Sequence, residues 1–345
     1  MTTSEIDGLA TTTAVVDAPS SDSSPSFAEL GVRPEIVTAL GERGITHTFA
    51  IQELTLPLAL AGSDLIGQAR TGMGKTYGFG VPLLHRISTG EVTRELDGTP
   101  RALVIVPTRE LCIQVTQDLK IAATGLTAPS GSGTRPLKVL SIYGGTPYEQ
   151  QTEALERGVD LVVGTPGRLL DLANQSKLVL GKVEVLVLDE ADEMLDLGFL
   201  PDIEKMLRMV PEKRQTMLFS ATMPGPIITL ARTFLTKPTH IRAEAADSGA
   251  THENTTQYVY RAHSMDKPEL VARILQADGR GATMIFCRTK RTAQKLADDL
   301  AERGFRVGAI HGDLGQGARE KSLKAFRSGD VDVLVATDVA ARGIN

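Results

Sequence analysis

The sequence predicts an α/β protein with two domains, each built on a mostly parallel β-sheet that helices cover on both faces. From Phe27 onward, short β-branched runs alternate with longer amphipathic stretches, and this alternation is typical of βαβ units. The alternation lapses once, in a polar segment over residues 243–255, and then resumes. A chain of 345 residues with 41% hydrophobic content is also long enough for about two cores.

The first predicted domain spans residues 27–242 and follows a tail. Residues 1–26 are rich in Ser, Thr, Ala and Asp with little to bury, so we expect this tail to be disordered. The insert 124–136 contains Ser-Gly-Ser-Gly and is predicted to be a flexible loop. The predicted strands of this domain are 102–106, 139–142, 161–163, 185–188 and 216–219.

The second predicted domain spans residues 256–345 and follows the linker 243–255. Its predicted strands are 257–260, 283–286, 307–310 and 333–335, and its predicted helices are 267–275, 293–303 and 319–326. A parallel sheet needs helices on both faces, but this chain stops soon after the fourth strand. We therefore expect the second domain to be incomplete.

Composition narrows the class of protein. The formal net charge is −5, so any contact with nucleic acid must come from local geometry instead of overall charge. Only Cys112 and Cys287 occur, far apart in sequence, which argues against a disulfide framework and favours the reducing cytoplasm. No apolar run approaches the ~20 residues that span a membrane, and the first 26 residues lack the Lys or Arg of a secretory signal.

A glycine-rich segment predicts a phosphate site. The segment matches the P-loop except that alanine replaces its first glycine: Ala69, Arg70, Thr71, Gly72, Met73, Gly74, Lys75 and Thr76. The two glycines let backbone N–H groups approach phosphate, while Lys75 carries charge to the β- and γ-phosphates. Thr76 offers a hydroxyl to Mg²⁺. On its own, the segment also fits an ordinary glycine-rich turn between a strand and a helix.

Two carboxylates at the end of a buried strand favour the phosphate interpretation. Asp189 and Glu190 directly follow the apolar run 183–188, which places them at the carboxyl edge of the sheet, where open α/β folds bind ligands. Asp189 is suited to hold Mg²⁺ through water. Glu190 is suited to orient and deprotonate an attacking water in phosphoryl transfer. Together with Lys75, these are the predicted catalytic residues.

With these motifs, the chain resembles the DEAD-box ATP-dependent RNA helicases of bacterial type, superfamily 2 proteins with two RecA-like P-loop domains. Further family motifs stand in the expected order: 44–52 (Q motif), 107–111 (Ia), 144–145 (GG), 165–168 (Ib), 220–222 (III), 285–287 (IV), 311–313 with Gln316 and Arg319, and 337–343 (V). The resemblance covers about Phe27 to Asn345 and implies ATP and Mg²⁺ as cofactors.

The resemblance also implies individual roles. Gln52 reads the adenine edge through its amide, with Phe27 packing nearby. Ser220 and Thr222 hydrogen-bond the Asp-Glu-Ala-Asp segment through Asp192 and couple hydrolysis to domain closure. The expected RNA contacts, mostly to the sugar-phosphate backbone and independent of sequence, are Thr108, Arg109, Gly145, Thr165, Arg168, Gly312 and Thr337. Protein partners are not predicted.

The chain departs from the family pattern in three places. Thr48, Phe49 and Ala50 stand where the Q motif usually has Pro-Thr-Pro, and Asn345 stands where motif V usually ends in Asp. The 345 residues contain no His-Arg-Ile-Gly-Arg-Thr-Gly-Arg block, the family's motif VI. Because such arginines stabilise the transferring phosphate, we expect impaired turnover from this chain.

Two other functions remain open from the sequence alone. A non-catalytic, nucleotide-dependent RNA-binding clamp or assembly factor fits the missing arginine block but not the intact Lys75, Asp189 and Glu190. A DNA-directed superfamily 2 translocase fits the P-loop, whereas the Gln52 region and the Asp-Glu-Ala-Asp segment favour RNA.

Overall fold

The computed structural model describes residues 2–3, 12–17, 24–88, 99–130, 133–244, 256 and 258–337. The chain divides into two compact units, Met1–Ser248 and Gly249–Asn345, and each is described by itself. Both are α/β units with parallel sheets, as the sequence predicts. None of the helices in the described ranges combines the length and apolar character that crossing a membrane requires.

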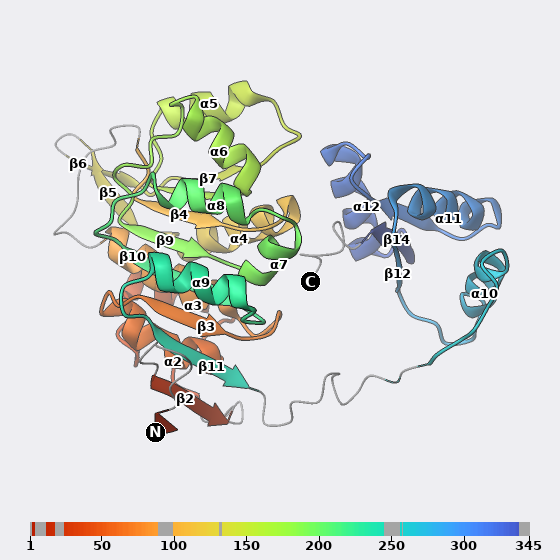
Figure 1. Cartoon of the computed structure of the whole chain (residues 1–345), viewed down its shortest axis with the longest axis horizontal. Helices are drawn as coiled ribbons and strands as arrows, with labels where there is room; N and C mark the ends of the chain where they lie inside the picture. Colours follow the sequence, from red (N-terminus) through yellow and green to blue (C-terminus); the bar gives the residue numbers. More distant parts are fainter. Residues whose placement is uncertain are drawn as a thin grey trace. The chain divides into compact units, whose positions relative to one another are not determined.

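Unit 1 is built on a nine-stranded sheet with the order β1-β2-β11-β3-β10-β9-β4-β8-β7 (Figure 1). All of its pairings are parallel except that between β1 and β2. The strands are β1 (Thr2–Thr3), β2 (Thr12–Asp17), β3 (Leu65–Gln68), β4 (Ala102–Ile105), β7 (Val139–Ile142), β8 (Leu161–Gly164), β9 (Val185–Leu188), β10 (Gln215–Ser220) and β11 (Thr239–Glu244). The five strands predicted for this domain are confirmed.

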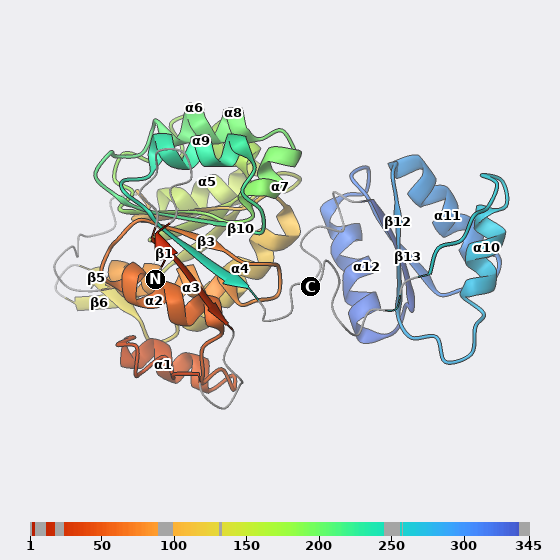
Figure 2. The same cartoon turned by 60° about the horizontal axis from the view of Figure 1, so that its bottom comes forward.

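Helices cover both faces of this sheet. One face carries α1 (Pro34–Gly41), α2 (Ala50–Leu60), α3 (Lys75–Ser88) and α4 (Arg109–Ala122). The other carries α5 (Tyr148–Glu156), α6 (Pro166–Asn174), α7 (Ala191–Asp196), α8 (Leu200–Leu207) and α9 (Gly225–Phe234). Figure 2 shows α2 and α3 on one side of the sheet and α6, α8 and α9 on the other.

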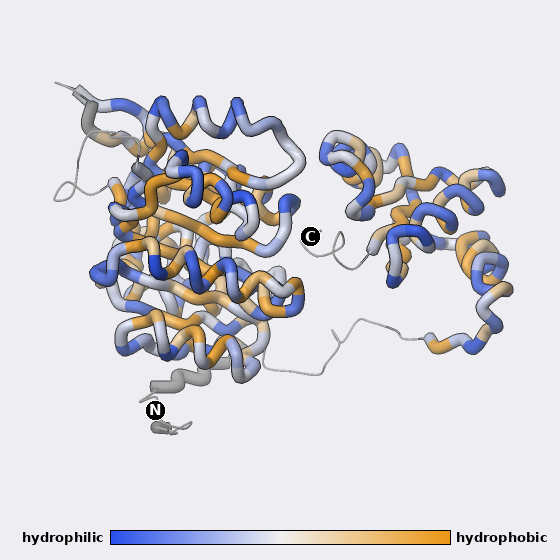
Figure 3. Tube along the Cα trace, turned by 45° about the horizontal axis from the view of Figure 1, so that its top comes forward, coloured by the Kyte–Doolittle hydropathy of each residue, from blue (hydrophilic) through white to orange (hydrophobic). Residues whose placement is uncertain are grey.

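Alternation along the strands explains the two cores. Val104 of β4 packs into the core beneath α2–α4, while its neighbours Leu103 and Ile105 pack into the core on the opposite face. Successive side chains of a strand point to opposite faces, so a central parallel strand must be apolar at every position. Figure 3 shows these hydrophobic strands between helices in which hydrophilic and hydrophobic residues alternate.

The structure differs from the expected disorder in the N-terminal tail. Strand β2 pairs in parallel with β11, with Ala14 opposite Ile241 and Asp17 opposite Glu244. A β-branched run of this kind fits an open sheet edge, a possibility that a composition argument overlooks. Residues 1, 4–11 and 18–23 of the expected tail lie outside the described residues.

The insert expected to be a flexible loop contains a hairpin. Strands β5 (Thr127–Ser130) and β6 (Gly133–Pro136) form a two-stranded antiparallel sheet. Arg135 on β6 reaches the unit 1 sheet, where its two terminal nitrogens lie 2.7 and 2.8 Å from the carboxylate oxygens of Asp160. This buried ion pair fixes a segment whose glycines and serines alone suggest flexibility.

Unit 2 contains a smaller parallel sheet with the order β12-β14-β13. Its strands are β12 (Thr283–Cys287), β13 (Val307–Ile310) and β14 (Val333–Thr337), and its helices are α10 (Lys267–Ile274), α11 (Lys290–Glu302) and α12 (Gln316–Ser328). Helices α10 and α11 pack on one face, and α12 packs on the other. The three predicted helices and three of the four predicted strands are confirmed.

The strand predicted over residues 257–260 is wrong where the structure describes it. Tyr258, Val259 and Tyr260 have no strand assignment, and Val259 is 97% exposed. No strand in the described part of unit 2 pairs with this run, so its β-propensity alone cannot form a ladder. Gln257 and residues 245–255 of the predicted linker lie outside the described residues, whereas Ala243 and Glu244 belong to β11.

Candidate active site

The glycine-rich segment turns between β3 and α3 at the carboxyl edge of the unit 1 sheet. Gly72 and Gly74 have φ angles of +85° and +79°, a left-handed conformation that glycine adopts without a Cβ penalty. The backbone N–H of Ala69 donates to the carbonyl of Ser220 at 3.1 Å, which joins the start of the segment to the end of β10. The sequence here therefore forms the strand–turn–helix geometry that a P-loop requires.

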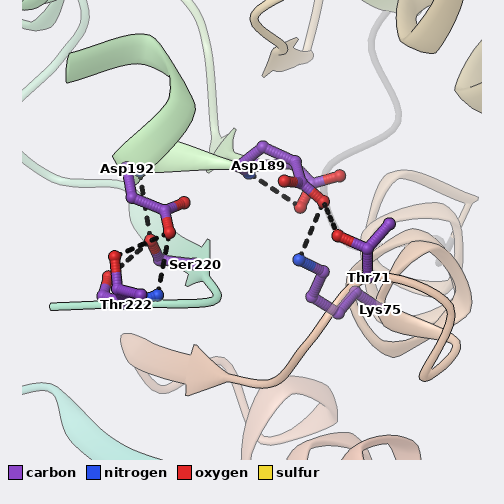
Figure 4. Close-up of polar contacts among 7 residues, drawn as sticks. Thr71, Lys75, Asp189, Asp192, Ser220 and Thr222 are labelled. Atoms are coloured by element: carbon purple, nitrogen blue, oxygen red, sulfur yellow. Dashed lines mark hydrogen bonds and ion pairs between the residues drawn. The ribbon is translucent and has the colours of Figure 1, made fainter. Parts of the chain in front are cut away.

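Lys75, at the first turn of α3, points to the carboxylates that follow β9 (Figure 4). Its ammonium nitrogen lies 2.9 Å from Oε1 of Glu190, and only 5% of Lys75 is exposed. The hydroxyl of Thr71 donates to the same Glu190 oxygen at 3.4 Å. Strands β3 and β9 both flank β10, so their carboxyl ends bring these residues together.

Charge and burial shift the pKa values of this group. Burial disfavours the charged form of Lys75, but the carboxylates of Asp189 and Glu190 outweigh it and raise the lysine pKa. Asp189 is 2% exposed, and burial raises its pKa to about 7 despite the nearby lysine. One Asp189 oxygen accepts the backbone N–H of Glu190 at 2.9 Å. A divalent cation bound beside Asp189 would lower this pKa and return the carboxyl to its charged form.

Glu190 has a strained backbone. Its φ and ψ angles are 55° and 50°, a left-handed conformation that costs a non-glycine residue about 1 kcal/mol or more. This conformation directs its side chain to Lys75 while α7 begins at the next residue. Such strain is found at functional sites that the surrounding structure enforces.

Asp192, Ser220 and Thr222 form one hydrogen-bonded network between α7 and the end of β10 (Figure 4). Oδ2 of Asp192 accepts the backbone N–H and the hydroxyl of Thr222, both at 2.8 Å. The Ser220 hydroxyl accepts the Asp192 N–H at 3.1 Å and donates to the Thr222 carbonyl at 2.7 Å. Burial would raise the pKa of Asp192, but these hydrogen bonds lower it on balance.

The residues present fit the magnesium ion that the resemblance implies. Mg²⁺ prefers oxygen ligands and keeps several waters. Asp189 supplies a buried carboxylate after β9, and Thr76 supplies a hydroxyl at the start of α3, next to Lys75. Their roles as ligands stay a prediction.

Gln52 joins α2 to the P-loop. Its amide nitrogen donates to the carbonyl of Gly74 at 2.7 Å, and its amide oxygen accepts the backbone N–H of Phe49 at 2.9 Å. Phe27, which the sequence analysis also assigns to the nucleotide, is 1% exposed in the core beneath α1 and α2. Gln52 is equally buried at 1% exposed, so both side chains are covered in this structure and their contact with a nucleotide stays a prediction.

The predicted RNA contacts of unit 1 also gather at the carboxyl edge of the sheet. They follow β4, β7 and β8, which are neighbours in the sheet. The hydroxyl of Thr108 caps α4 by accepting the Leu111 N–H at 3.3 Å. Arg109 lies against Gly145, whose φ is +85° and where a Cβ would approach the guanidinium to 2.5 Å. The positive φ favours glycine there, and a Cβ would make the end of the arginine side chain shift.

Arg168 is held by residues that the sequence analysis missed. Its guanidinium lies 3.9 Å from the ring centroid of Tyr148 and donates to the Thr146 carbonyl at 3.2 Å. Gln151 accepts a third contact at 3.3 Å. Thr165, three residues earlier, is the N-cap residue of α6. No local pattern in the sequence distinguishes Tyr148 or Gln151 from other helix residues.

The two predicted RNA contacts of the second domain lie in unit 2. Thr337 is the last residue of β14 and is 6% exposed. Gly312 follows β13, and a Cβ there would lie 3.4 Å from Cε of Lys290. Both belong to the carboxyl side of the unit 2 sheet, whereas the rest of predicted motif V, residues 338–343, lies outside the described residues.

Comparison with known protein families decides the classification. The DEAD/DEAH box helicase family model matches residues 49–230, and the helicase conserved C-terminal domain model matches residues 266–345. The chain belongs to the DEAD-box helicase family. The site residues around Lys75 fall within the first match, and the unit 2 sheet falls within the second.

Curated DEAD-box relatives resemble most of the chain. The DEAD-box ATP-dependent RNA helicase CshA of Streptococcus pneumoniae is 44% identical over 319 residues, covering 92% of this chain and 58% of the relative. The ATP-dependent RNA helicase DeaD of Mycobacterium tuberculosis is 42% identical, covering 94% of this chain and 54% of the relative. The chain thus spans somewhat more than half the length of these relatives.

Solved DEAD-box structures share the fold. A DEAD box protein from Methanococcus jannaschii is 36% identical with a TM-score of 0.57, covering 93% of this chain and 82% of that one. S. cerevisiae Dbp5, solved with RNA and ADP BeF3, is 28% identical with a TM-score of 0.77, covering 92% of this chain and 77% of that one.

Proposed function

We propose that the chain is the nucleotide-dependent part of an ATP-dependent RNA helicase. Unit 1 would bind ATP with Mg²⁺, and ATP binding and hydrolysis would drive the local separation of an RNA duplex. The observation that carries this proposal is the convergence of Lys75, Asp189 and Glu190 at the edge where β3 and β9 end. The relatives named as ATP-dependent RNA helicases support the same activity.

The chemistry follows from the positions of the side chains. Lys75 would leave Glu190 and neutralise charge on the β- and γ-phosphates. Glu190, once released, would orient the attacking water and accept its proton. Mg²⁺ bound near Asp189 and Thr76 would supply further positive charge at the phosphates. Ser220 and Thr222, which are hydrogen-bonded to Asp192, would couple ATP hydrolysis to closure of the two domains.

RNA is the proposed partner, held through its sugar-phosphate backbone without regard to sequence. The relatives' names and the RNA present with Dbp5 support the choice of RNA. Thr108, Arg109 and Arg168 are polar groups of the right kind, at one edge of the unit 1 sheet. A cytoplasmic location, predicted from the sequence, stays a proposal.

We further propose that these 345 residues hydrolyse ATP slowly by themselves. The sequence contains no arginine block of the motif VI type, and an arginine finger is worth roughly 10³–10⁵ in rate in other phosphoryl-transfer enzymes. Nucleotide binding should persist because Lys75, Gln52 and the P-loop glycines are all in unit 1.

RNA-stimulated ATP hydrolysis tests both proposals. The chain is compared with a version extended through a His-Arg-Ile-Gly-Arg-Thr-Gly-Arg block, and Glu190→Gln in each version supplies the blank. Stimulated turnover in the extended version alone is the expected result. Equal turnover in both would contradict the slow-hydrolysis proposal. Nucleotide-dependent RNA binding with no turnover in either would instead favour the clamp.

A further inference from the structure

Phe49 is an exposed aromatic residue beside the P-loop. It is 60% exposed, the highest value for a large hydrophobic residue within the described part of unit 1. A Cβ built on Gly74 would lie 2.5 Å from Cδ2 of Phe49 and equally close to the amide nitrogen of Gln52. The phenyl ring therefore stands against the P-loop backbone, next to the amide that links α2 to it.

Helix geometry gives no reason for a phenylalanine here. Phe49 is the N-cap residue of α2, a position that favours Ser, Thr, Asp or Asn because their side-chain oxygens accept an orphan N–H. Phenylalanine offers no acceptor, and its ring gains little burial in exchange. Natural proteins tend to break such local rules at functional or strained positions.

The other aromatic residues near this position are engaged elsewhere. Phe27 is almost fully buried in the core, and Tyr77 on α3 packs against the same core. Among the residues that the structure describes around the P-loop, Phe49 is the aromatic ring with a largely open face.

Gln52 leaves polar capacity for a ligand beside this ring. Its amide nitrogen has two hydrogens and uses one on Gly74, and its amide oxygen has two lone pairs and uses one on Phe49 N–H. One donor and one acceptor thus remain, which is what the edge of an adenine base requires. Gln52 is 1% exposed, so a base would reach these groups only where the neighbouring Phe49 ring moves aside. A flat ring next to such an edge-reading amide suits the face of the same base.

We propose that Phe49 is a base-stacking residue of the nucleotide site. Its ring packs on the face of the purine while Gln52 addresses the edge, so Phe49 supplies affinity for a base and Gln52 supplies the choice among bases. The inference rests on the proposed nucleotide binding by unit 1. It adds a binding residue at a position where the family usually has a threonine.

The decisive variant is Phe49→Ser, because serine restores a helix cap while it removes the ring. ADP and inorganic pyrophosphate, each with Mg²⁺, are titrated calorimetrically into the parent chain and the variant. We expect ADP affinity to fall roughly 5- to 100-fold, the range of base–aromatic stacking, with pyrophosphate affinity changed less than about twofold. The unfolding temperature should stay equal or rise.

Equal losses for ADP and pyrophosphate would show that the ring only supports the P-loop, and they would overturn the proposal. Unchanged ADP affinity would overturn it as well. If the parent chain binds neither ligand, the nucleotide site itself is refuted instead. GDP provides one more readout. Loss of stacking should weaken GDP and ADP binding by a similar factor, so the ratio of their affinities, which Gln52 sets, should stay unchanged.

A fluorescence measurement reports on the ring directly. The chain contains no tryptophan, so Phe49→Trp creates a single indole at the site. ADP should quench this indole more strongly than saturating pyrophosphate, because only ADP carries a base to stack. Met209→Trp is the matched control, since Met209 is exposed and follows α8 on the opposite face of the sheet. Equal quenching by ADP and pyrophosphate at position 49 would overturn the stacking role.

Discussion

Glu190 shows how one residue can carry both a strained backbone and a charged contact. Its left-handed conformation places the carboxylate on Lys75 instead of extending it from the start of α7. The strand β9 positions residue 189, and the helix α7 begins at residue 191, so a sharp turn between them must fall on Glu190. Strain of this kind is tolerated because two rigid elements fix both sides of the residue.

His240 on β11 should make unit 1 sensitive to mild acid. Burial, helped by Arg242, lowers its pKa from 6.5. The native state therefore binds fewer protons than the unfolded state, so stability present above pH 6.5 is lost as the pH falls through the lowered pKa. We expect His240→Gln to remove part of the stability that the parent loses between pH 7 and pH 5.

Urea unfolding at a series of pH values measures this difference. Glutamine keeps a polar side chain opposite Gln68, which lies 3.1 Å from the histidine ring. At pH 8 and above, the unfolding free energies of the parent and the variant should differ by an amount that does not depend on pH. Parallel pH profiles down to pH 5 would show that His240 does not carry the effect.

Which residues meet at the site could be predicted at this scale, but their contacts could not. Lys75 and Asp189 follow from a glycine-rich turn and from a strand that ends in carboxylates. The Lys75–Glu190 contact and the left-handed Glu190 depend on how two distant elements pack, which no local pattern encodes. Tyr148, which stacks on Arg168, was missed for the same reason.

At the scale of elements, the hairpin β5–β6 depends on one buried ion pair. Asp160 is 1% exposed and also accepts the Lys138 N–H at 2.8 Å. Removing one partner from a buried pair leaves a charge without compensation. We expect Arg135→Leu to destabilise unit 1 by about 3 kcal/mol.

A second substitution should recover most of this loss. Arg135→Leu combined with Asp160→Asn removes the stranded charge and keeps an oxygen for the Lys138 N–H. Urea midpoints of the single and double variants give the comparison, and Arg157→Ala, which breaks an exposed pair with Glu153, is the control without expected effect. A double variant less stable than the single one would contradict this account.

Elements with strong periodicity were predictable, and elements that depend on a partner were not. The central strands and the helices of unit 2 were found because buried runs and amphipathic faces are local signals. The run 258–260 has similar β-propensity but no pairing strand in the described residues. Conversely, β2 pairs with the distant strand β11, and β6 is anchored by the ion pair between Arg135 and Asp160.

At the scale of the whole molecule, each unit has its own apolar cores. Unit 1 holds the two cores on either face of its nine-stranded sheet, and unit 2 holds a core on each face of its smaller sheet. All described residues of the nucleotide site belong to unit 1. Each unit therefore has the means to unfold separately.

ADP with Mg²⁺ should raise the unfolding temperature of unit 1 alone. A ligand at about 100 times its Kd stabilises the state that binds it by about 2.7 kcal/mol. Differential scanning calorimetry should show two transitions, of which only the larger shifts with ADP. Lys75→Ala should abolish the shift. Movement of both transitions together would show that the units unfold as one.

If unit 1 hydrolyses ATP as proposed, the ion pair between Lys75 and Glu190 would also bear on how the cycle ends. Each group already has a partner, so an arriving phosphate would have to replace Glu190 at the lysine. After hydrolysis, Glu190 would compete with the product phosphate for Lys75. The contact would thus weaken substrate binding and promote product release, and it would hold the proposed general base until a substrate replaces it.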